Sequence, residues 1–405
     1  MTAASRLYAA MLRAGPAATR DIEVRRNIGV RAPDGTVLLT DLYLARPGRP
    51  RPVILMRCPY GRGLYRLVAR LFAEHGYHAV IQSTRGTFGS GGRIDFDAEA
   101  GDGRAAADWI IAQPWSDGTI GTFGSSYLGL TQFALASTRP PQLKAMAVAA
   151  WGAERRAYKY PGGAFTLEQA LGWAFTMEQQ ERAFAFIRTP LRMRRALAPA
   201  FDHLPLLDAD TAAVGHPVGY YQDWVTHDQP GDPYWTPTDF RPVLKDLGVP
   251  VTMIAGWYDM FLPQMLADYR QLRDGGQDVR LRVGAWHHLS QGLGRQAVAD
   301  ALDWFGTHLL GGAQARGETA PQGAAGRPRL RVEVMGGGGW RSLADWPPDA
   351  AVQRWYLRPG GTLAPGAPGA PAESGPDRYT YDPADPTPSV GGATVILDAG
   401  PRDNG

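Results

Sequence analysis

The sequence predicts an α/β fold built on a mostly parallel sheet. Three observations support this prediction. Short apolar runs alternate with helical patterns, the alternation lapses once and then resumes, and a serine follows one apolar run on a glycine-rich turn. Strands that alternate with helices are joined by right-handed crossovers, which make neighbouring strands parallel. The chain has 405 residues, enough for two or three domains.

Strand and helix patterns alternate from residue 21 to residue 150, which we interpret as the first part of an α/β core. The predicted strands are a hairpin over 22–44 that turns at Asp34-Gly35, followed by 53–56, 78–81, 119–122 and 143–150. The predicted helices are 64–75, 98–113 and 127–136.

The alternation lapses over 151–240, where a helix is predicted at 167–186 and we expect an inserted helical cap. It then resumes over 241–312, the second part of the core. This part holds strands at 251–255 and 279–283, a helix after Pro263 and a last helix at 296–310.

The two ends of the chain differ from the core. Residues 1–20 form a lead-in, and 313–327 form a linker rich in glycine and alanine. From 328 to 405 the chain has β patterns at 330–334, 352–357 and 393–397 without a helix between them. We therefore expect a small β unit there, with too few strands for a complete sandwich.

Composition excludes several functional classes. The formal charge is only +3 and the basic residues are scattered, so we expect no nucleic-acid partner. The single cysteine, Cys58, excludes an internal disulfide and cysteine-based zinc sites. The apolar patch at 7–12 is too short for a signal peptide or a membrane span. We expect a cytoplasmic protein without a membrane partner, and a homodimer stays open.

The residues Gly124-x-Ser126-x-x-Gly129 have almost the G-x-S-x-G spacing of a nucleophile elbow, a sharp turn that exposes a serine between a strand and a helix. Glycines on both sides of the serine let neighbouring backbone pass closely. The second glycine comes one residue late. The alternative is therefore a glycine-rich turn with an ordinary surface serine.

A serine hydroxyl becomes a good nucleophile when an imidazole takes its proton and a carboxylate orients that imidazole. In hydrolases with this elbow the chain order is serine, acid, histidine. Asp259 follows the strand predicted at 251–255, and His287-His288 follow the strand at 279–283. The carboxyl ends of parallel strands meet at one sheet edge, so this order predicts a catalytic triad. Paired histidines also suggest a metal site, but no ligand cluster accompanies them in the sequence, so we expect no metal.

The tetrahedral intermediate of such a reaction requires hydrogen-bond donors for its oxyanion. The backbone N–H of Tyr127, directly after the serine, is one candidate. The loop Arg57-Cys58-Pro59-Tyr60-Gly61-Arg62 places the hydroxyl of Tyr60 as a second candidate. The alternative for Tyr60 is an aromatic ring packed beside a proline turn.

Several motifs along nearly the whole chain resemble those of the cocaine esterase and X-Pro dipeptidyl-peptidase family, an α/β-hydrolase family of serine hydrolases. The motifs are Pro59-Tyr60, Arg85-Gly86, Gln113-Pro114-Trp115, Gly124-Ser125-Ser126-Tyr127, Gly256-Trp257-Tyr258-Asp259, Gly284-Ala285-Trp286-His287-His288, Asp345-Trp346-Pro347-Pro348 and Gly400-Pro401-Arg402-Asp403.

The resemblance implies roles for individual residues. Ser126 is expected to be the nucleophile, Asp259 the orienting acid and His288 the base, with His287 in the variable position. Tyr60 hydroxyl and Tyr127 N–H would hold the oxyanion. An apolar wall for the acyl group is expected from Trp151, Trp257 and Phe261, although packing of the cap explains these side chains nearly as well.

The sequence departs from the family pattern in two places. Ser83 stands where the family usually has aspartate after glutamine, and the C-terminal β unit, a jelly roll in the family, ends at Gly405. We therefore expect a partial jelly roll that is cut short, with unpaired edge strands.

The function predicted from these residues is hydrolysis of carboxylic esters through an acyl-enzyme, without a cofactor. The alternative is an X-Pro dipeptidyl-peptidase or an amino-acyl ester or amide hydrolase, which needs a carboxylate to bind the substrate ammonium. No second carboxylate stands beside Asp259, which favours an uncharged acyl group. Acidic residues of the cap that still fit this role are Asp202, Asp208, Asp223 and Asp228. A further alternative is a catalytically inactive binding protein that keeps the hydrolase shell.

Overall fold

The fold was analysed in a computed structural model. It describes residues 3–46, 48–182, 185–311, 328–358, 360–367, 378–385, 387, 390–395 and 399–402, without the side chains of 3 and 185–192. The predicted linker at 313–327 lies outside these residues, and so do positions 396 and 397 of the last predicted strand.

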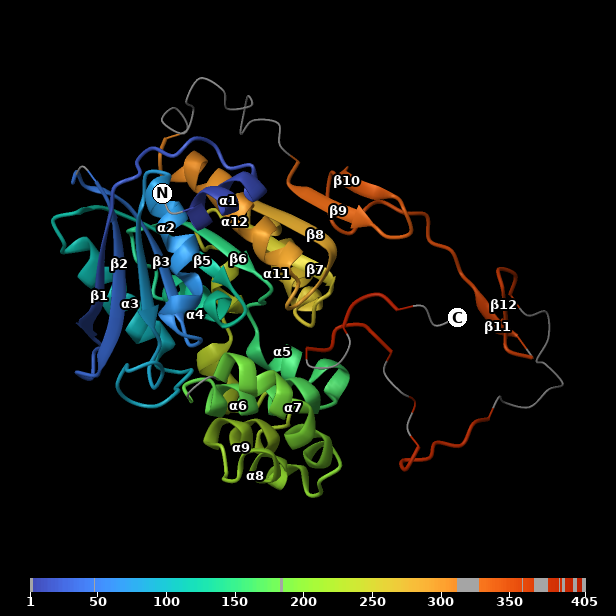
Figure 1. The fold of residues 1–405 in the computed structure, drawn as a ribbon. Helices are drawn as coiled ribbons and strands as arrows, with labels where there is room; N and C mark the ends of the chain where they lie inside the picture. The colour runs from blue at the N-terminus through green and yellow to red at the C-terminus, as the bar shows by residue number, and fades with distance from the viewer. Residues whose placement is uncertain are drawn as a thin grey trace.

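A ten-stranded mixed sheet forms the centre of the molecule, in the order β1-β2-β4-β3-β5-β6-β7-β8-β9-β10 (Figure 1). Strands β3 to β9 run parallel to one another, whereas β2 pairs antiparallel with both β1 and β4, and β10 pairs antiparallel with β9. The strands are β1 (Ile22–Arg31), β2 (Val37–Ala45), β3 (Arg51–Cys58), β4 (His78–Ser83), β5 (Ser116–Ser125), β6 (Leu143–Ala149), β7 (Val251–Tyr258), β8 (Val279–His287), β9 (Leu330–Val334) and β10 (Gly339–Leu343). The predicted α/β class and its mostly parallel core are confirmed.

Helices cover both faces of the sheet, because the strands in the middle of the sheet carry apolar side chains on both faces. One face packs against α1 (Ala3–Leu12), α2 (Arg66–Glu74), which follows the short 3₁₀ turn η1 (Arg62–Tyr65), and α12 (Gln291–His308). The other face packs against α3 (Glu99–Ile111), α4 (Tyr127–Ser137) and α11 (Leu262–Asp274).

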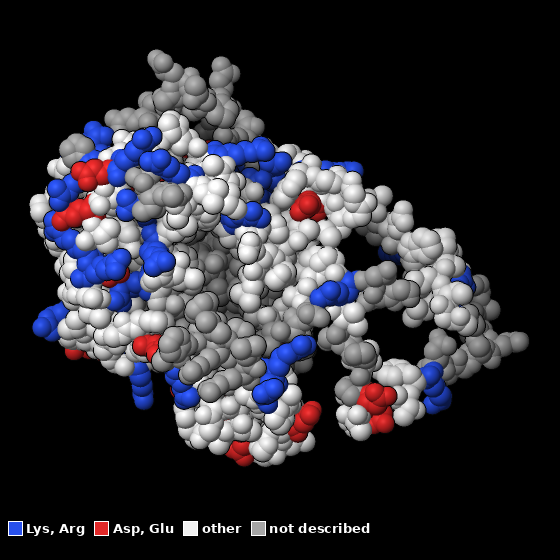
Figure 2. Space-filling view, in the orientation of Figure 1, with Lys and Arg blue, Asp and Glu red and all other residues white. Residues whose placement is uncertain are grey.

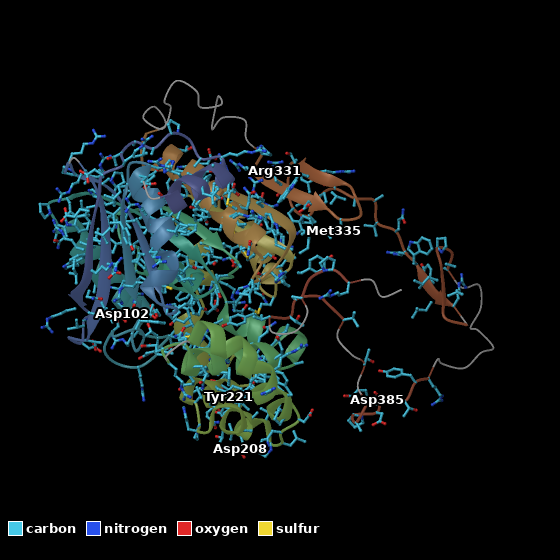
Figure 3. The ribbon with its side chains drawn as sticks, in the orientation of Figure 1. Asp102, Asp208, Tyr221, Arg331, Met335 and Asp385 are labelled. Atoms are coloured by element: carbon cyan, nitrogen blue, oxygen red, sulfur yellow. The ribbon has the colours of Figure 1, made fainter. Side chains whose placement is uncertain are left out.

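A helical unit between β6 and β7, in the region where the alternation of strands and helices lapses, lies at one end of the sheet (Figure 1). Its 3₁₀ turns are η2 (Pro161–Gly163), η3 (Leu206–Asp208) and η4 (Pro233–Thr238), and α10 (Arg241–Leu244) leads back to the sheet. Its helices are α5 (Arg155–Lys159), α6 (Leu167–Gln179), α7 (Ala185–Phe201), α8 (Ala209–Val214) and α9 (Gly219–Thr226). Tyr221, labelled in Figure 3, ties α9 to η3 by donating a 2.8 Å hydrogen bond to the carbonyl of Leu206.

Two predicted elements differ in the structure. The helix predicted at 167–186 is two helices, because α6 ends at Gln179 and α7 begins at Ala185. The strand at 330–334 does not open a separate β unit, since β9 pairs in parallel with β8 and extends the central sheet. Its Leu330 and Val332 are buried in the same hydrophobic core as the central strands, which explains this pairing.

Beyond β10 the described chain extends away from the sheet (Figure 1). The strand predicted at 352–357 begins only at Tyr356, where β11 (Tyr356–Arg358) pairs with β12 (Thr362–Ala364) in a two-stranded ribbon. Near the end of the chain, the backbone N–H of Val395 donates a 3.0 Å hydrogen bond to Glu168 of α6. The partial jelly roll stays a prediction.

Basic and acidic side chains are mixed on the face seen in Figure 2, with many basic side chains over the sheet and its helices. Within the described residues, no helix combines the length and apolar character needed to cross a bilayer.

Candidate active site

Ser126 occupies a strained turn between β5 and α4. Its backbone has φ 59° and ψ −129°, a region that non-glycine residues rarely adopt. The turn is held by a 3.0 Å hydrogen bond from the Ser126 N–H to the carbonyl of Ala149 and a 2.6 Å bond from the Gly129 N–H to the Ser126 carbonyl. These bonds fix the serine at the carboxyl edge of the sheet.

Both glycines of the turn are required by close packing. A Cβ atom added at Gly124, whose φ is +155°, would lie 2.2 Å from the Cβ of Leu128. A Cβ atom at Gly129 would lie 2.4 Å from the Cβ of Trp151. Gly129, the glycine that comes one residue late in the motif, therefore leaves space for the side chain of Trp151, which follows β6.

The structure brings Ser126, His288 and Asp259 into one hydrogen-bonded chain. The Nε2 of His288 lies 3.0 Å from the Oγ of Ser126, and its Nδ1 lies 2.9 Å from the Oδ2 of Asp259. Asp259 is only 2 % exposed, and its other oxygen accepts a 2.8 Å bond from the Phe261 N–H. The imidazole that contacts both Ser126 and Asp259 is therefore that of His288. The neighbouring His287 uses its backbone N–H to donate a 2.8 Å hydrogen bond to the Ser290 hydroxyl.

Tyr60 points its hydroxyl at the serine. The two hydroxyl oxygens are 3.5 Å apart, and the Nε1–H of Trp173 in α6 donates a 3.2 Å hydrogen bond to the Tyr60 oxygen. The backbone N–H of Tyr127 also interacts with this hydroxyl, and burial raises the pKa of Tyr60. Tyr60 therefore stays protonated and, with its oxygen accepting from the indole, can direct its proton toward Ser126.

A buried ionic network supports the residue after the serine. The hydroxyl of Tyr127 donates a 2.7 Å hydrogen bond to Glu99, and burial raises the pKa of Tyr127 well above its ordinary value. Glu99 pairs with Arg57 at 2.5 Å, and Arg57 lies 3.7 Å from Asp102, which Figure 3 labels beside the first strands. The network anchors the side chain of Tyr127 and so helps to orient its backbone N–H.

A mostly aromatic cavity opens beside Ser126. It is lined by Tyr60, Phe96, Ser126, Tyr127, Trp151, Tyr158, Lys159, Gln169, Trp173, Trp224, Met260 and Phe261. Trp151 and Phe261 are in contact, with ring centroids 4.6 Å apart. The cavity is thus formed jointly by the sheet edge and the helical unit.

Trp257, expected in the apolar wall, does not line this cavity. Its Nε1–H donates a 2.7 Å hydrogen bond to the carbonyl of Glu333, and its ring lies 6.1 Å from that of Trp346. It comes at the end of β7, two residues before the acid, and β9 and the segment after β10 cover it. Position beside the acid in sequence was therefore misleading, because the direction of the Trp257 ring is set by its contacts with Glu333 and Trp346, which are distant in sequence.

Sequence reasoning missed most of the cavity. Phe96, Tyr158, Lys159, Trp173 and Trp224 line it, and all but Phe96 come from the inserted helical unit. The abundance of tryptophan and tyrosine in that unit was the available signal, but the helix packing that brings them to Ser126 is not encoded in any local motif. The acidic residues weighed for an ammonium site, Asp202, Asp208, Asp223 and Asp228, are not among the lining residues.

The serine at position 83 belongs to an arginine site nearby. Its hydroxyl accepts a 2.5 Å hydrogen bond from Arg62, which also donates 3.0 Å and 2.6 Å bonds to Asp41 and Asn27. Asp41 of β2 thus supplies a carboxylate to this guanidinium. No group of three or more His, Cys, Asp or Glu side chains is placed to hold a metal ion within the described part of the chain.

Comparison with known proteins identifies the family. The family model described as X-Pro dipeptidyl-peptidase (S15 family) matches residues 34–290. Cocaine esterase of Rhodococcus sp. (strain MB1 Bresler) is 33 % identical over 94 % of this chain and 71 % of its own length.

Solved structures have the same fold. An α-amino acid ester hydrolase matches with a TM-score of 0.69 at 22 % identity, over 92 % of this chain and 67 % of its own. An aminopeptidase of a marine sediment archaeon, Thaumarchaeota, matches with a TM-score of 0.68 at 22 % identity, over 91 % of this chain and 66 % of its own. The chain thus spans about two thirds of the length of these structures. It belongs to the X-Pro dipeptidyl-peptidase (S15) family of hydrolytic enzymes, as its motifs predict.

Proposed function

We propose that the chain is a serine hydrolase of carboxylic esters in which Ser126, His288 and Asp259 form the catalytic triad. The observation that carries this proposal is the hydrogen-bonded chain from Ser126 through His288 to the buried Asp259, with bonds of 3.0 Å and 2.9 Å. The 33 % identity to cocaine esterase, whose name describes an esterase, supports ester hydrolysis.

The first half of the reaction forms an acyl-enzyme. Ser126 Oγ attacks the carbonyl carbon of the ester while its proton moves to Nε2 of His288. Asp259, on Nδ1, stabilises the imidazolium that forms. The negative charge on the former carbonyl oxygen is held by the Tyr127 N–H and the Tyr60 hydroxyl. Collapse of the intermediate breaks the ester C–O bond, and the alcohol leaves with the proton from His288.

The second half returns the free enzyme. Water attacks the acyl carbon while His288 takes one of its protons, and the same donors hold the oxyanion. Collapse breaks the bond to Ser126, whose oxygen recovers the proton from His288, and the carboxylic acid leaves. The aromatic cavity that includes Trp151 and Phe261 would hold the acyl group during both steps.

Cleavage of X-Pro dipeptides or other amino-acyl substrates is the second candidate, favoured by the family itself. Such substrates carry an ammonium group, which needs a nearby carboxylate. None of the described residues that line the cavity is acidic, and one of them, Lys159, is basic. These features favour esters over amino-acyl substrates. An inactive binding protein is disfavoured by the intact hydrogen-bonded chain at Ser126.

The test compares initial rates on short-chain and benzoyl aryl esters with those on an Ala-Pro aryl amide, with Ser126→Ala as the blank. We expect ester turnover that falls by about 10⁴-fold or more in the variant, and little amide turnover. Preferred cleavage of the amide would instead assign a peptidase. If Ser126→Ala keeps both the ester and the amide turnover of the unmodified protein, the serine takes no part in the mechanism.

A further inference from the structure

A lysine is buried in the wall of the aromatic cavity. Lys159, the last residue of α5, is only 2 % exposed and lines the same cavity as Ser126 and Tyr60. It is one of three lysines in the chain, and the other two, Lys144 and Lys245, are exposed. Of the described residues that line the cavity, it alone is a charged type.

The amino group of Lys159 has aromatic rings as neighbours instead of a carboxylate. Its Nζ lies 3.7 Å from the ring centroid of Trp224 and 5.1 Å from that of Tyr158. In the described part of the structure, it has neither a hydrogen bond nor an ion pair. Its pKa is lowered well below the ordinary value, first by burial and then by the charge of Arg155. Cation–π contacts recover less free energy than the burial of an unpaired ammonium costs.

The surroundings provide further hydrogen-bonding capacity. Gln169 of α6 lines the same cavity, and its Oε1 is buried without a hydrogen-bond partner. Because the O and N atoms of an amide exchange places by a 180° flip, Gln169 can offer either a donor or an acceptor. Arg155, one helical turn before Lys159, is also buried, with its Nε bonded to Thr238 at 2.9 Å, and adds positive potential.

These positions imply a specific kind of ligand. An amino group with free donors in a mostly aromatic cavity favours a ligand group that is anionic and accepts hydrogen bonds, because an anion stabilises the charged form that burial disfavours. A carboxylate has these properties. A substrate ammonium group is positively charged and would be repelled by Lys159 and Arg155. The cavity therefore discriminates between a carboxylate and an ammonium group on the substrate.

We propose that Lys159 binds a carboxylate at the far end of the acyl group, so that monoesters of linear dicarboxylic acids are the preferred substrate class. The proposal rests on the proposed ester hydrolysis at Ser126. It replaces the expectation of an uncharged acyl group that the sequence suggests.

The first test uses the unmodified protein and matched 4-nitrophenyl esters. For succinyl, glutaryl and adipoyl chains, kcat/KM is compared with that of the apolar ester in which an isopropyl group replaces the carboxylate. A third ester carries a neutral carboxamide there. With spontaneous hydrolysis subtracted by Ser126→Ala, we expect at least one carboxylate ester to exceed its apolar partner by about 10-fold or more, as a charge-assisted hydrogen bond provides. Equal rates, or preference for the apolar or carboxamide ester at every length, would overturn the proposal.

The second test removes the charge. Lys159→Met keeps an unbranched side chain as far as the ε atom and removes the amino group, and we expect the ratio of carboxylate to apolar kcat/KM to fall by about 10-fold or more. Lys144→Met makes the same change at an exposed position at the opposite end of β6, and its ratio should equal that of the unmodified protein. A ratio that is unaffected by Lys159→Met would exclude the lysine as the anion site.

The rates distinguish an error about ester hydrolysis at Ser126 from an error about the carboxylate site at Lys159. If ester hydrolysis at Ser126 is wrong, every ester is turned over at the Ser126→Ala rate. If only the carboxylate site is wrong, the apolar esters are still cleaved in a Ser126-dependent reaction without preference for the carboxylate. Should Lys159→Met not fold, the ester series on the unmodified protein still decides the question.

Discussion

The indole N–H of Trp173 donates a 3.2 Å hydrogen bond to the hydroxyl oxygen of Tyr60, which lies 3.5 Å from Ser126 Oγ. An indole only donates, so this bond occupies one lone pair of the Tyr60 oxygen and leaves its proton for another acceptor. The helical unit, which carries Trp173, thereby orients the hydroxyl of Tyr60 at the edge of the sheet. The sequence of the loop around Pro59 does not specify this arrangement by itself.

We expect Tyr60→Phe to lower kcat by about 10²-fold, because one oxyanion donor is lost. Trp173→Phe should lower kcat by about 5-fold, the value of a neutral hydrogen bond. If Trp173 acts through Tyr60, the double variant will be no slower than Tyr60→Phe. Rates that multiply in the double variant would mean that Trp173 acts by another route, such as packing in the cavity.

The adjacent histidines provide a second prediction. His288→Ala should reduce ester turnover by about 10⁴-fold or more, because it removes the base that contacts Ser126 at 3.0 Å. His287→Ala should keep most of the activity, since the bond from its backbone to Ser290 is retained. Initial rates on one aryl ester test both variants, and equal losses would contradict the assignment of the base.

The local motifs predicted the elbow, the order of acid and histidine and most strand positions, because each depends on residues close together in sequence. Ser126, Asp259 and His288 meet since three parallel strands end at one edge. The cavity was harder to predict, since Trp173 and Lys159 reach it through packing of the inserted helices. Trp257 and β9 were misjudged for the same reason, because burial of β9 against β8 depends on contacts distant in sequence.

The late glycine of the elbow leads to a third prediction. Gly129→Ala places a methyl group 2.4 Å from the Cβ of Trp151, so we expect overpacking to lower the free energy of unfolding by about 1–3 kcal/mol. Gly294→Ala is the matched control, because this helical glycine of α12 has nothing within 4 Å of an added Cβ and should gain about 0.5–1 kcal/mol. Urea unfolding measures both, and equal effects would contradict the packing argument.

A fourth prediction concerns Asp268, a carboxyl group of α11 that is only 2 % exposed. Burial raises its pKa to about 7, although the N–H of Ala153 donates a 2.6 Å hydrogen bond to it. In the unfolded chain this group titrates near its usual pKa of about 3.9. Between these values the folded protein retains a proton that the unfolded chain has released. The contribution of Asp268 to stability therefore falls as pH rises from about 4 to about 7, and is constant above that.

Asp268→Asn tests this sign. The amide keeps an acceptor for the Ala153 N–H but does not ionise, so the stability of the variant relative to the unmodified protein should increase by about 1.4 kcal/mol per pH unit from pH 5 to pH 7 and change little from pH 7 to pH 8. Asp117→Asn is the control, since Asp117 is exposed and its oxygen accepts a turn hydrogen bond from Thr119 that asparagine also accepts. Urea unfolding at several pH values gives both differences. Parallel stability curves for Asp268→Asn and the unmodified protein would show that Asp268 ionises alike in the folded and unfolded states, which the burial of this α11 carboxyl group against Ala153 argues against.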